Sequence, residues 1–220
     1  MRDFDELFQI AADRKGGAAA LEAMLDKPKP AAELAATPED RWLAQFTRSI
    51  FQAGFNWKVI ENKWSGFEAA FDGFDVGRCA MMDDVKFDAL VADKRIVRNP
   101  IKIATVRDNA AFLLELRHEG GAGQVIGGWP SEDYIGLLDM LKKRGSHLGA
   151  NSAQYALRFL RRDGFILSRD VTARLVAEGV IDKPATSKTA MRAVQDAFNT
   201  WTAQSGRSLT EISRVLAMSV

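Results

Sequence analysis

The chain has 220 residues, which suits one domain or two small ones at about 100–200 residues per domain. Its 30 Lys and Arg nearly balance 29 Asp and Glu, so a protein that is basic throughout is excluded, and its single Cys excludes an intramolecular disulfide. The acidic N-terminus and the lack of an apolar run near about 18 residues predict a soluble, cytoplasmic protein with no signal peptide or membrane span.

Helix signals recur along the whole chain. Thr37 and Pro38 provide an N-cap and a proline at the first helical position, and apolar residues then recur at spacings of three and four. This pattern predicts a helix over about 38–53, which Gly54 ends. Similar signals predict further helices at about 57–71, 77–82, 83–90, 99–118, 131–145, 151–163, 170–178, 187–204 and 208–218. Alternating strand patterns are almost absent, so the sequence favours an all-α fold.

Composition shifts suggest how the chain is divided. The Ala-rich, Pro-containing stretch 27–38 is typical of a connector, so the residues before it predict an appended helical piece. We expect an N-terminal extension over 1–36, a main domain over 37–188 and a C-terminal helical extension over 189–220.

Charge is unevenly distributed. Residues 141–192 hold eleven basic and four acidic side chains, a net charge of +7, whereas residues 1–40 have a net charge of −4. A basic block in a neutral chain is typical of a phosphate-binding face. A solvated helix surface that is rich in arginine explains the count equally well.

Five segments carry a recognisable pattern in their order and spacing. They are Phe51-Gln52-Ala53-Gly54-Phe55-Asn56-Trp57, Phe67-Glu68-Ala69-Ala70-Phe71, Phe74-Asp75, Arg98-Asn99-Pro100-Ile101-Lys102 and Leu160-Arg161-Arg162-Asp163-Gly164-Phe165. Together these segments resemble the bacterial DNA-3-methyladenine glycosylase I family, and the resemblance covers roughly residues 38–182. It implies a helix-hairpin-helix fold and a base excision repair enzyme that flips a modified base out of DNA and hydrolyses its N-glycosidic bond.

A base-flipping enzyme needs a wedge that fills the gap in the duplex and an aromatic slot for the extruded base. Gly54 and Phe55, at the turn that ends a helix, are the expected wedge. Trp57 is the expected wall of the slot, with Gln52 and Asn56 near the base, and a cationic alkylated adenine suits an aromatic face. The alternative is that Phe51, Phe55 and Trp57 are ordinary core residues.

The basic block contains the expected contacts with the DNA backbone. Arg161, Arg162 and Gly164 stand between two helices, where a hairpin offers backbone amides and a helix N-terminus to a phosphate. Arg169 occupies the position of a second glycine in the family, and an arginine there can also reach a phosphate. Lys188 is expected to extend the anionic track. Each of these cations is otherwise a solvated surface charge.

The chain departs from the family at its expected catalytic group. Ser49 stands where the family places a glutamate, and a neutral hydroxyl cannot stabilise positive charge that develops on the sugar. Asp182 is the alternative acid, because relatives in the wider superfamily place an Asp downstream of the hairpin glycine. It lies eighteen residues after Gly164, and otherwise it caps the next helix.

The family's zinc ligands have no counterparts in this chain, so we expect neither a metal nor an organic cofactor. The resemblance implies a monomeric glycosylase that acts on alkylated adenine, 3-methyladenine, in double-stranded DNA. The alternative is a catalytically inactive or repurposed protein on the same scaffold, which binds DNA or senses damage without cleaving it.

Overall fold

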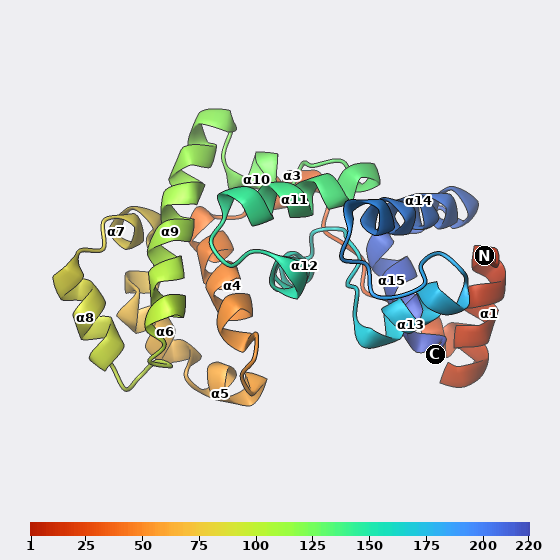
Figure 1. Cartoon of the computed structure of the whole chain (residues 1–220), viewed down its shortest axis with the longest axis horizontal. Coiled ribbons are helices and arrows are strands. Elements are labelled where there is room, and N and C mark those ends of the chain that lie inside the picture. Colours follow the sequence, from red (N-terminus) through yellow and green to blue (C-terminus); the bar gives the residue numbers. More distant parts are fainter. The chain divides into compact units, whose positions relative to one another are not determined.

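The computed structural model describes residues 1–149 and 151–220, and these form helices and turns without a strand (Figure 1). The all-α prediction is therefore confirmed. The chain forms two compact units. Unit 1 comprises Met1–Lys29, Pro130–Gly136 and Arg161–Val220, and unit 2 comprises Pro30–Trp129 and Leu137–Leu160. Most of the predicted N-terminal extension thus shares unit 1 with the predicted C-terminal extension. The predicted domain boundaries at residues 36 and 188 stay predictions.

Unit 1 is built from both ends of the chain. Three of its helices are capped by serines: the hydroxyls of Ser168, Ser187 and Ser208 accept N–H groups of the first turns of α13, α14 and α15. The unit contains α1 (Phe4–Lys15), α2 (Ala18–Glu22), η3 (Ser131–Asp133), the first residues of α11 (Tyr134–Arg144), α13 (Arg169–Ala177), α14 (Lys188–Ser205) and α15 (Leu209–Met218).

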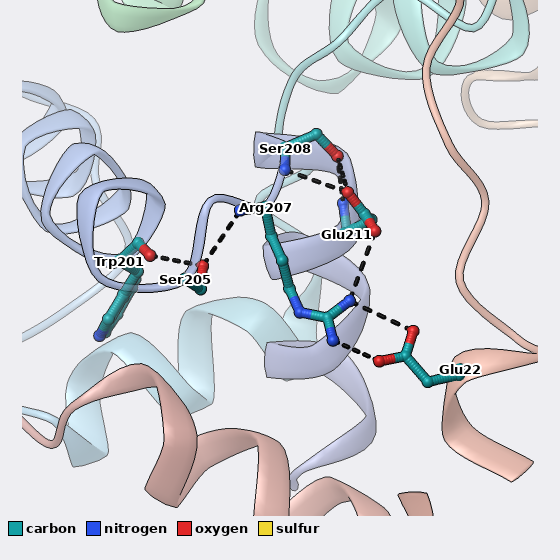
Figure 2. Close-up of polar contacts among 6 residues, drawn as sticks. All are labelled: Glu22, Trp201, Ser205, Arg207, Ser208 and Glu211. Carbon is teal, nitrogen blue, oxygen red and sulfur yellow. Dashed lines mark hydrogen bonds and ion pairs between the residues drawn. The ribbon is translucent and has the colours of Figure 1, made fainter. Parts of the chain in front are cut away.

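Arg207 joins the two ends of the chain inside unit 1 (Figure 2). Its guanidinium donates to both carboxylate oxygens of Glu22, which ends α2, and to Glu211 of α15. Glu211 also accepts the backbone N–H of Ser208 at 3.1 Å, which completes a capping box. Arg207 thus links α2 to α15, and α1 packs directly on α15.

Unit 2 surrounds a pair of long helices, α4 and α9, which pack against each other (Figure 1). Helix α12 packs on α4, and α7 packs on α9. The unit contains α3 (Ala31–Ala35), α4 (Glu39–Gln52), α5 (Trp57–Asn62), α6 (Trp64–Ala70), η1 (Asp72–Phe74), α7 (Val76–Ala80), α8 (Asp84–Ala92), α9 (Pro100–Leu116), η2 (Arg117–Glu119), α10 (Ala122–Val125), the rest of α11 and α12 (Ala150–Phe159).

The helix predicted over 38–53 is confirmed as α4, but three other expectations were wrong in part. The connector 27–38 contains α3. The helix predicted over 57–71 is broken at Lys63 into α5 and α6. This break accompanies close packing at Gly66, where a Cβ atom would lie 2.5 Å from the carbonyl oxygen of Arg95. The helix predicted over 151–163 stops at Phe159, because Arg161 adopts a left-handed φ of 61°.

Aromatic rings form much of the core of unit 2. Trp64, Phe67, Phe71 and Phe74 stack with centroids 5.4–6.3 Å apart, and the three phenylalanines are buried. Cys79 lies buried nearby, as predicted, and burial raises the pKa of its thiol to about 12. The aromatic-rich segment after α5 is therefore a packing element that lies against α4.

Candidate functional site

The turn after α4 carries the predicted wedge. Gly54 has a φ of 76°, which favours glycine, and the N–H of Phe55 donates to the Gln52 carbonyl at 3.2 Å. Asn56 then starts α5, because its side-chain oxygen accepts the N–H of Lys58 at 3.0 Å. Phe55 is 40% exposed, so it is not the buried core residue that the alternative required.

A lysine from α9 reaches into this turn. The ammonium of Lys102 donates to the carbonyl oxygens of Ile50 at 2.8 Å and Ala53 at 2.5 Å, and lies 4.5 Å from the centroid of the Phe55 ring. Burial lowers the pKa of Lys102. The sequence reasoning assigned no role to this residue, although it stands in a segment that resembles the family.

Trp57 belongs to a cluster of three aromatic side chains within unit 2. Its ring centroid lies 5.3 Å from that of Tyr155 and 6.0 Å from that of Phe159, both edge-on and both from α12. Trp57 is 41% exposed and Phe159 is 48% exposed. The sequence reasoning missed Tyr155 and Phe159, and the signal that could have found them is their spacing of four on one helix face. Large exposed apolar patches are uncommon on protein surfaces and often mark binding sites.

Ser49 and Gln52 lie inside unit 2, on the α4 side of the turn. Ser49 is buried and its hydroxyl accepts a hydrogen bond from the Gln45 amide at 3.1 Å. Gln52 is 4% exposed and donates to the Glu61 carboxylate at 2.9 Å. The side-chain oxygen of Gln52 is buried without a hydrogen-bond partner among the described residues. The Glu61 carboxylate also lies 3.8 Å from the guanidinium of Arg48.

The loop after α12 carries the predicted backbone clamp, and it belongs to unit 1. Arg161 is exposed, and its guanidinium donates to the Lys27 carbonyl at 2.9 Å. Arg162 is only 2% exposed: its guanidinium lies 5.5 Å from the centroid of the Tyr134 ring and donates to the Asp163 carbonyl. Burial lowers the pKa of Arg162. The prediction that Arg162 contacts phosphate does not fit this position, because its charged group is inside the unit.

Close packing against Tyr134 also requires a glycine at position 164. A Cβ atom there would lie 2.5 Å from the ring of Tyr134. Its N–H donates to the Thr210 hydroxyl at 3.3 Å, and the Asp163 carboxylate accepts the N–H of Thr210 at 2.9 Å. The loop therefore caps the start of α15, which does not fit the predicted approach of the Gly164 backbone to a phosphate.

The other three predicted residues are exposed in unit 1. Arg169 begins α13 and Lys188 begins α14, while Asp182 lies in the turn between these helices. The idea that Asp182 caps the next helix was wrong, because the hydroxyl of Ser187 accepts the N–H of Ala190 at 3.1 Å and caps α14.

The basic block of residues 141–192 is divided between the two units. Lys143 pairs with Asp139 and Arg144 with Glu119 in unit 2, both at 2.7 Å. In unit 1, Arg174 pairs with the buried carboxylate of Glu178 at 3.3 Å. Part of the block is thus neutralised by ion pairs, and its net count overstates the free positive charge.

The described residues contain no group of three or more His, Cys, Asp and Glu side chains placed to hold a metal ion. Within the same residues, no helix combines the length and the apolar character that crossing a membrane requires.

Residues 37–126 match the methyladenine glycosylase family. A 69-residue segment is 32% identical to DNA-3-methyladenine glycosylase 1 of Escherichia coli (strain K12), and covers 31% of this chain and 37% of that protein. The chain resembles the DNA-3-methyladenine glycosylase I family. The family match includes the turn at Gly54 and ends before α12, so the resemblance inferred over 127–182 stays a prediction. The aligned segment spans little more than a third of the curated relative's length.

Solved structures support the fold. The Staphylococcus aureus 3-methyladenine DNA glycosylase I superposes with a TM-score of 0.50 at 19% identity, over 54% of this chain and 74% of that one. The Methanocaldococcus jannaschii 8-oxoguanine DNA glycosylase superposes with a TM-score of 0.52 at 12% identity, over 94% of this chain and 90% of that one. The fold is therefore similar to those of these two DNA glycosylases, in agreement with the predicted all-α, glycosylase-like fold.

Proposed function

We propose that this protein is a DNA glycosylase, which flips an alkylated adenine out of double-stranded DNA and hydrolyses its N-glycosidic bond. The observation that carries the proposal is the exposed pair Phe55 and Trp57 on a glycine turn, inside the segment 37–126 that matches the methyladenine glycosylase family. The name of the E. coli relative points to 3-methyladenine as the base.

In this proposal, the exposed aromatics divide the work of base flipping. Phe55 enters the gap that the base leaves, and the missing side chain of Gly54 lets the backbone approach the duplex. The extruded base stacks on Trp57, whose ring Tyr155 and Phe159 support from α12. Alkylation makes the adenine cationic, and an aromatic face attracts a cation.

Polar groups near Trp57 would then select the base. Gln52 has a buried side-chain oxygen without a hydrogen-bond partner among the described residues, and we assign it the amino group of the base as a donor. Asn56 uses its side-chain oxygen to cap α5 and has its amide nitrogen available for the base.

Bond cleavage needs little acid catalysis, because alkylation already makes the base a good leaving group. The cationic base departs with the bonding electrons as a neutral molecule and leaves positive charge on the sugar. Water then adds to C1′ and loses one proton to the solvent. No metal or organic cofactor is required for this step. Asp182, exposed in unit 1, is our candidate for the carboxylate that stabilises the charge, and Arg161, Arg169 and Lys188 are our candidates for phosphate contacts.

One observation favours a second candidate function. Ser49 is buried, bonded to Gln45 and uncharged, where the resemblance leads us to expect a glutamate. A protein without that carboxylate can still bind and flip a base. The second candidate is therefore a DNA-binding or damage-sensing protein that does not cleave.

Base release from alkylated duplex DNA separates the two candidates. The expected result is free 3-methyladenine, detected by chromatography, with a rate that falls about 30-fold in Trp57→Ala because one stacked base is worth about 1–3 kcal/mol. Met81→Ala, which removes an exposed apolar side chain elsewhere in unit 2, is the matched control and keeps the rate. Tight DNA binding without base release would favour the second candidate. A Trp57→Ala protein with full binding and activity would show that the base slot lies elsewhere.

A further inference from the structure

The geometry points to Lys102 as the residue that positions the Phe55 ring. We propose that Lys102 locks the turn after α4 and fixes this ring in the orientation that enters DNA. Lys102 does not touch the base in this proposal, so it is a positioning residue. The part that Phe55 plays in DNA rests on the proposed function, whereas the contact between the two side chains does not.

The first support is the set of carbonyl groups around the ammonium. The last carbonyl groups of a helix have no partner within the helix. Lys102 donates to those of Ile50 at 2.8 Å, Phe51 at 3.3 Å and Ala53 at 2.5 Å, which matches the three hydrogens of an ammonium. A positive charge at this end of α4 is also favoured by the helix dipole.

The second support is the contact with the ring. The Lys102 nitrogen lies 4.5 Å from the centroid of Phe55, within the range of a cation–π interaction, and 5.9 Å from that of Phe51. Phe51 is buried and fixed by its edge-on contact with Phe67 at 4.8 Å, whereas Phe55 is 40% exposed. Lys102 is therefore a main anchor of an exposed ring.

The third support is where the lysine comes from. Lys102 lies in the first turn of α9, a helix of 17 residues, and its own N–H donates to the Asn99 cap at 3.1 Å. The turn is thus tied to a long, packed helix rather than to another loop. An exposed side chain held this way is preordered for binding, so less conformational freedom is lost when it meets DNA.

Fluorine NMR of the free protein tests the contact. 4-Fluorophenylalanine at position 55 is expected to give one sharp resonance in the wild-type background. Lys102→Met, which keeps the apolar stem but removes the charge and all donors, is expected to shift and broaden it. Lys58→Met, which removes an exposed lysine beside the same turn, is the matched control and leaves the resonance in place. Lys102→Gln keeps a donor for the carbonyl groups but removes the charge. It is also expected to shift the resonance, so it provides the test if Lys102→Met does not fold.

Duplex DNA then tests the consequence. Lys102→Met is expected to lower the affinity for alkylated duplex, or the single-turnover rate of base release, by about tenfold. In a Phe55→Ala background the same change is expected to have no further effect, because the ring it positions is gone. An unchanged fluorine resonance in the lysine variants overturns the proposal, as does a loss that persists in full without Phe55. If the wild-type protein neither binds nor cleaves DNA, the proposed function fails, and the fluorine comparison alone decides whether Lys102 holds the ring.

Discussion

The Gly54 turn of unit 2 and the Gly164 loop of unit 1 each follow a helix, but the first exposes its aromatic side chains and the second buries Arg162. At the first, a Cβ on Gly54 would meet no described atom within 4 Å, and Phe55 and Trp57 are exposed. At the second, Arg162 is buried and Gly164 lies against Tyr134. A glycine or an arginine in a DNA-binding pattern can therefore serve the fold as well as the ligand, and the neighbours decide which.

The arginines of the second loop give the largest expected contrast in stability. Arg162→Ala removes a buried side chain that packs on Tyr134, and we expect the free energy of unfolding to fall by about 3 kcal/mol. Arg161→Ala, at the exposed neighbouring position, is expected to change it by less than about 0.5 kcal/mol. Urea unfolding of both variants measures the difference. Equal stabilities would show that Arg162 is not a structural residue.

The glycines give the next contrast. Gly164→Ala is expected to cost about 2 kcal/mol, because the added carbon must displace the Tyr134 ring or the loop. Gly54→Ala meets no such obstacle and is expected to cost about 1 kcal/mol through its positive φ alone. Thermal unfolding compares the two variants, and DNA affinity is expected to fall more for Gly54→Ala. The reverse order of affinities would place the DNA-binding surface on the second loop.

A smaller effect concerns how stability depends on pH through the buried Glu178 carboxylate of unit 1. Burial raises the pKa of Glu178, but hydrogen bonds from the backbone and guanidinium of Arg2, with help from Arg174, outweigh it and lower the pKa. A carboxyl whose folded pKa lies below its unfolded pKa of about 4.3 stabilises the fold above that value. This contribution is lost as the pH falls through the folded pKa.

Glu178→Gln is therefore expected to be less stable than wild type at pH 7, by about 1 kcal/mol, and to lose less stability on acidification. Urea midpoints at pH 7, 5 and 3.5 measure both quantities. Glu33→Gln in unit 2, at an exposed carboxylate, is the matched control. If Glu178→Gln loses as much stability on acidification as the wild type, other carboxyl groups cause the acid sensitivity.

The smallest expected effect is electrostatic. Three cations are exposed in unit 1: Arg161, Arg169 and Lys188. Log affinity falls linearly with log salt concentration, and replacing any one of them by Ala is expected to reduce the magnitude of this slope by about one. Arg162→Ala is expected to leave the slope unchanged, because its charge is buried. Binding titrations at several salt concentrations measure these slopes. Equal slopes for wild type and all three exposed variants would remove unit 1 from the DNA-binding surface.

Local signals predicted most of the helices. Caps such as Asn99 and Ser208 act over three residues, so they can be recognised without the rest of the chain. The break at Lys63 and the early end at Phe159 were missed, because they depend on contacts with Arg95 and on a left-handed arginine. The sequence predicted Gly54 and Phe55 at a helix-ending turn and Trp57 at the start of the next helix, while their supports Lys102, Tyr155 and Phe159 came only with the folded chain.

The sequence by itself determined the all-helical class, the resemblance to the methyladenine glycosylase family and the turn that ends α4. These follow from periodicity, capping and short motifs, which are local properties of the chain. Only the tertiary structure decided which charges are free: it buried Arg162 against Tyr134, paired Arg144 with Glu119 and brought Lys102 to the turn. Burial and pairing depend on residues far apart in the chain, so no count of basic residues can reveal them.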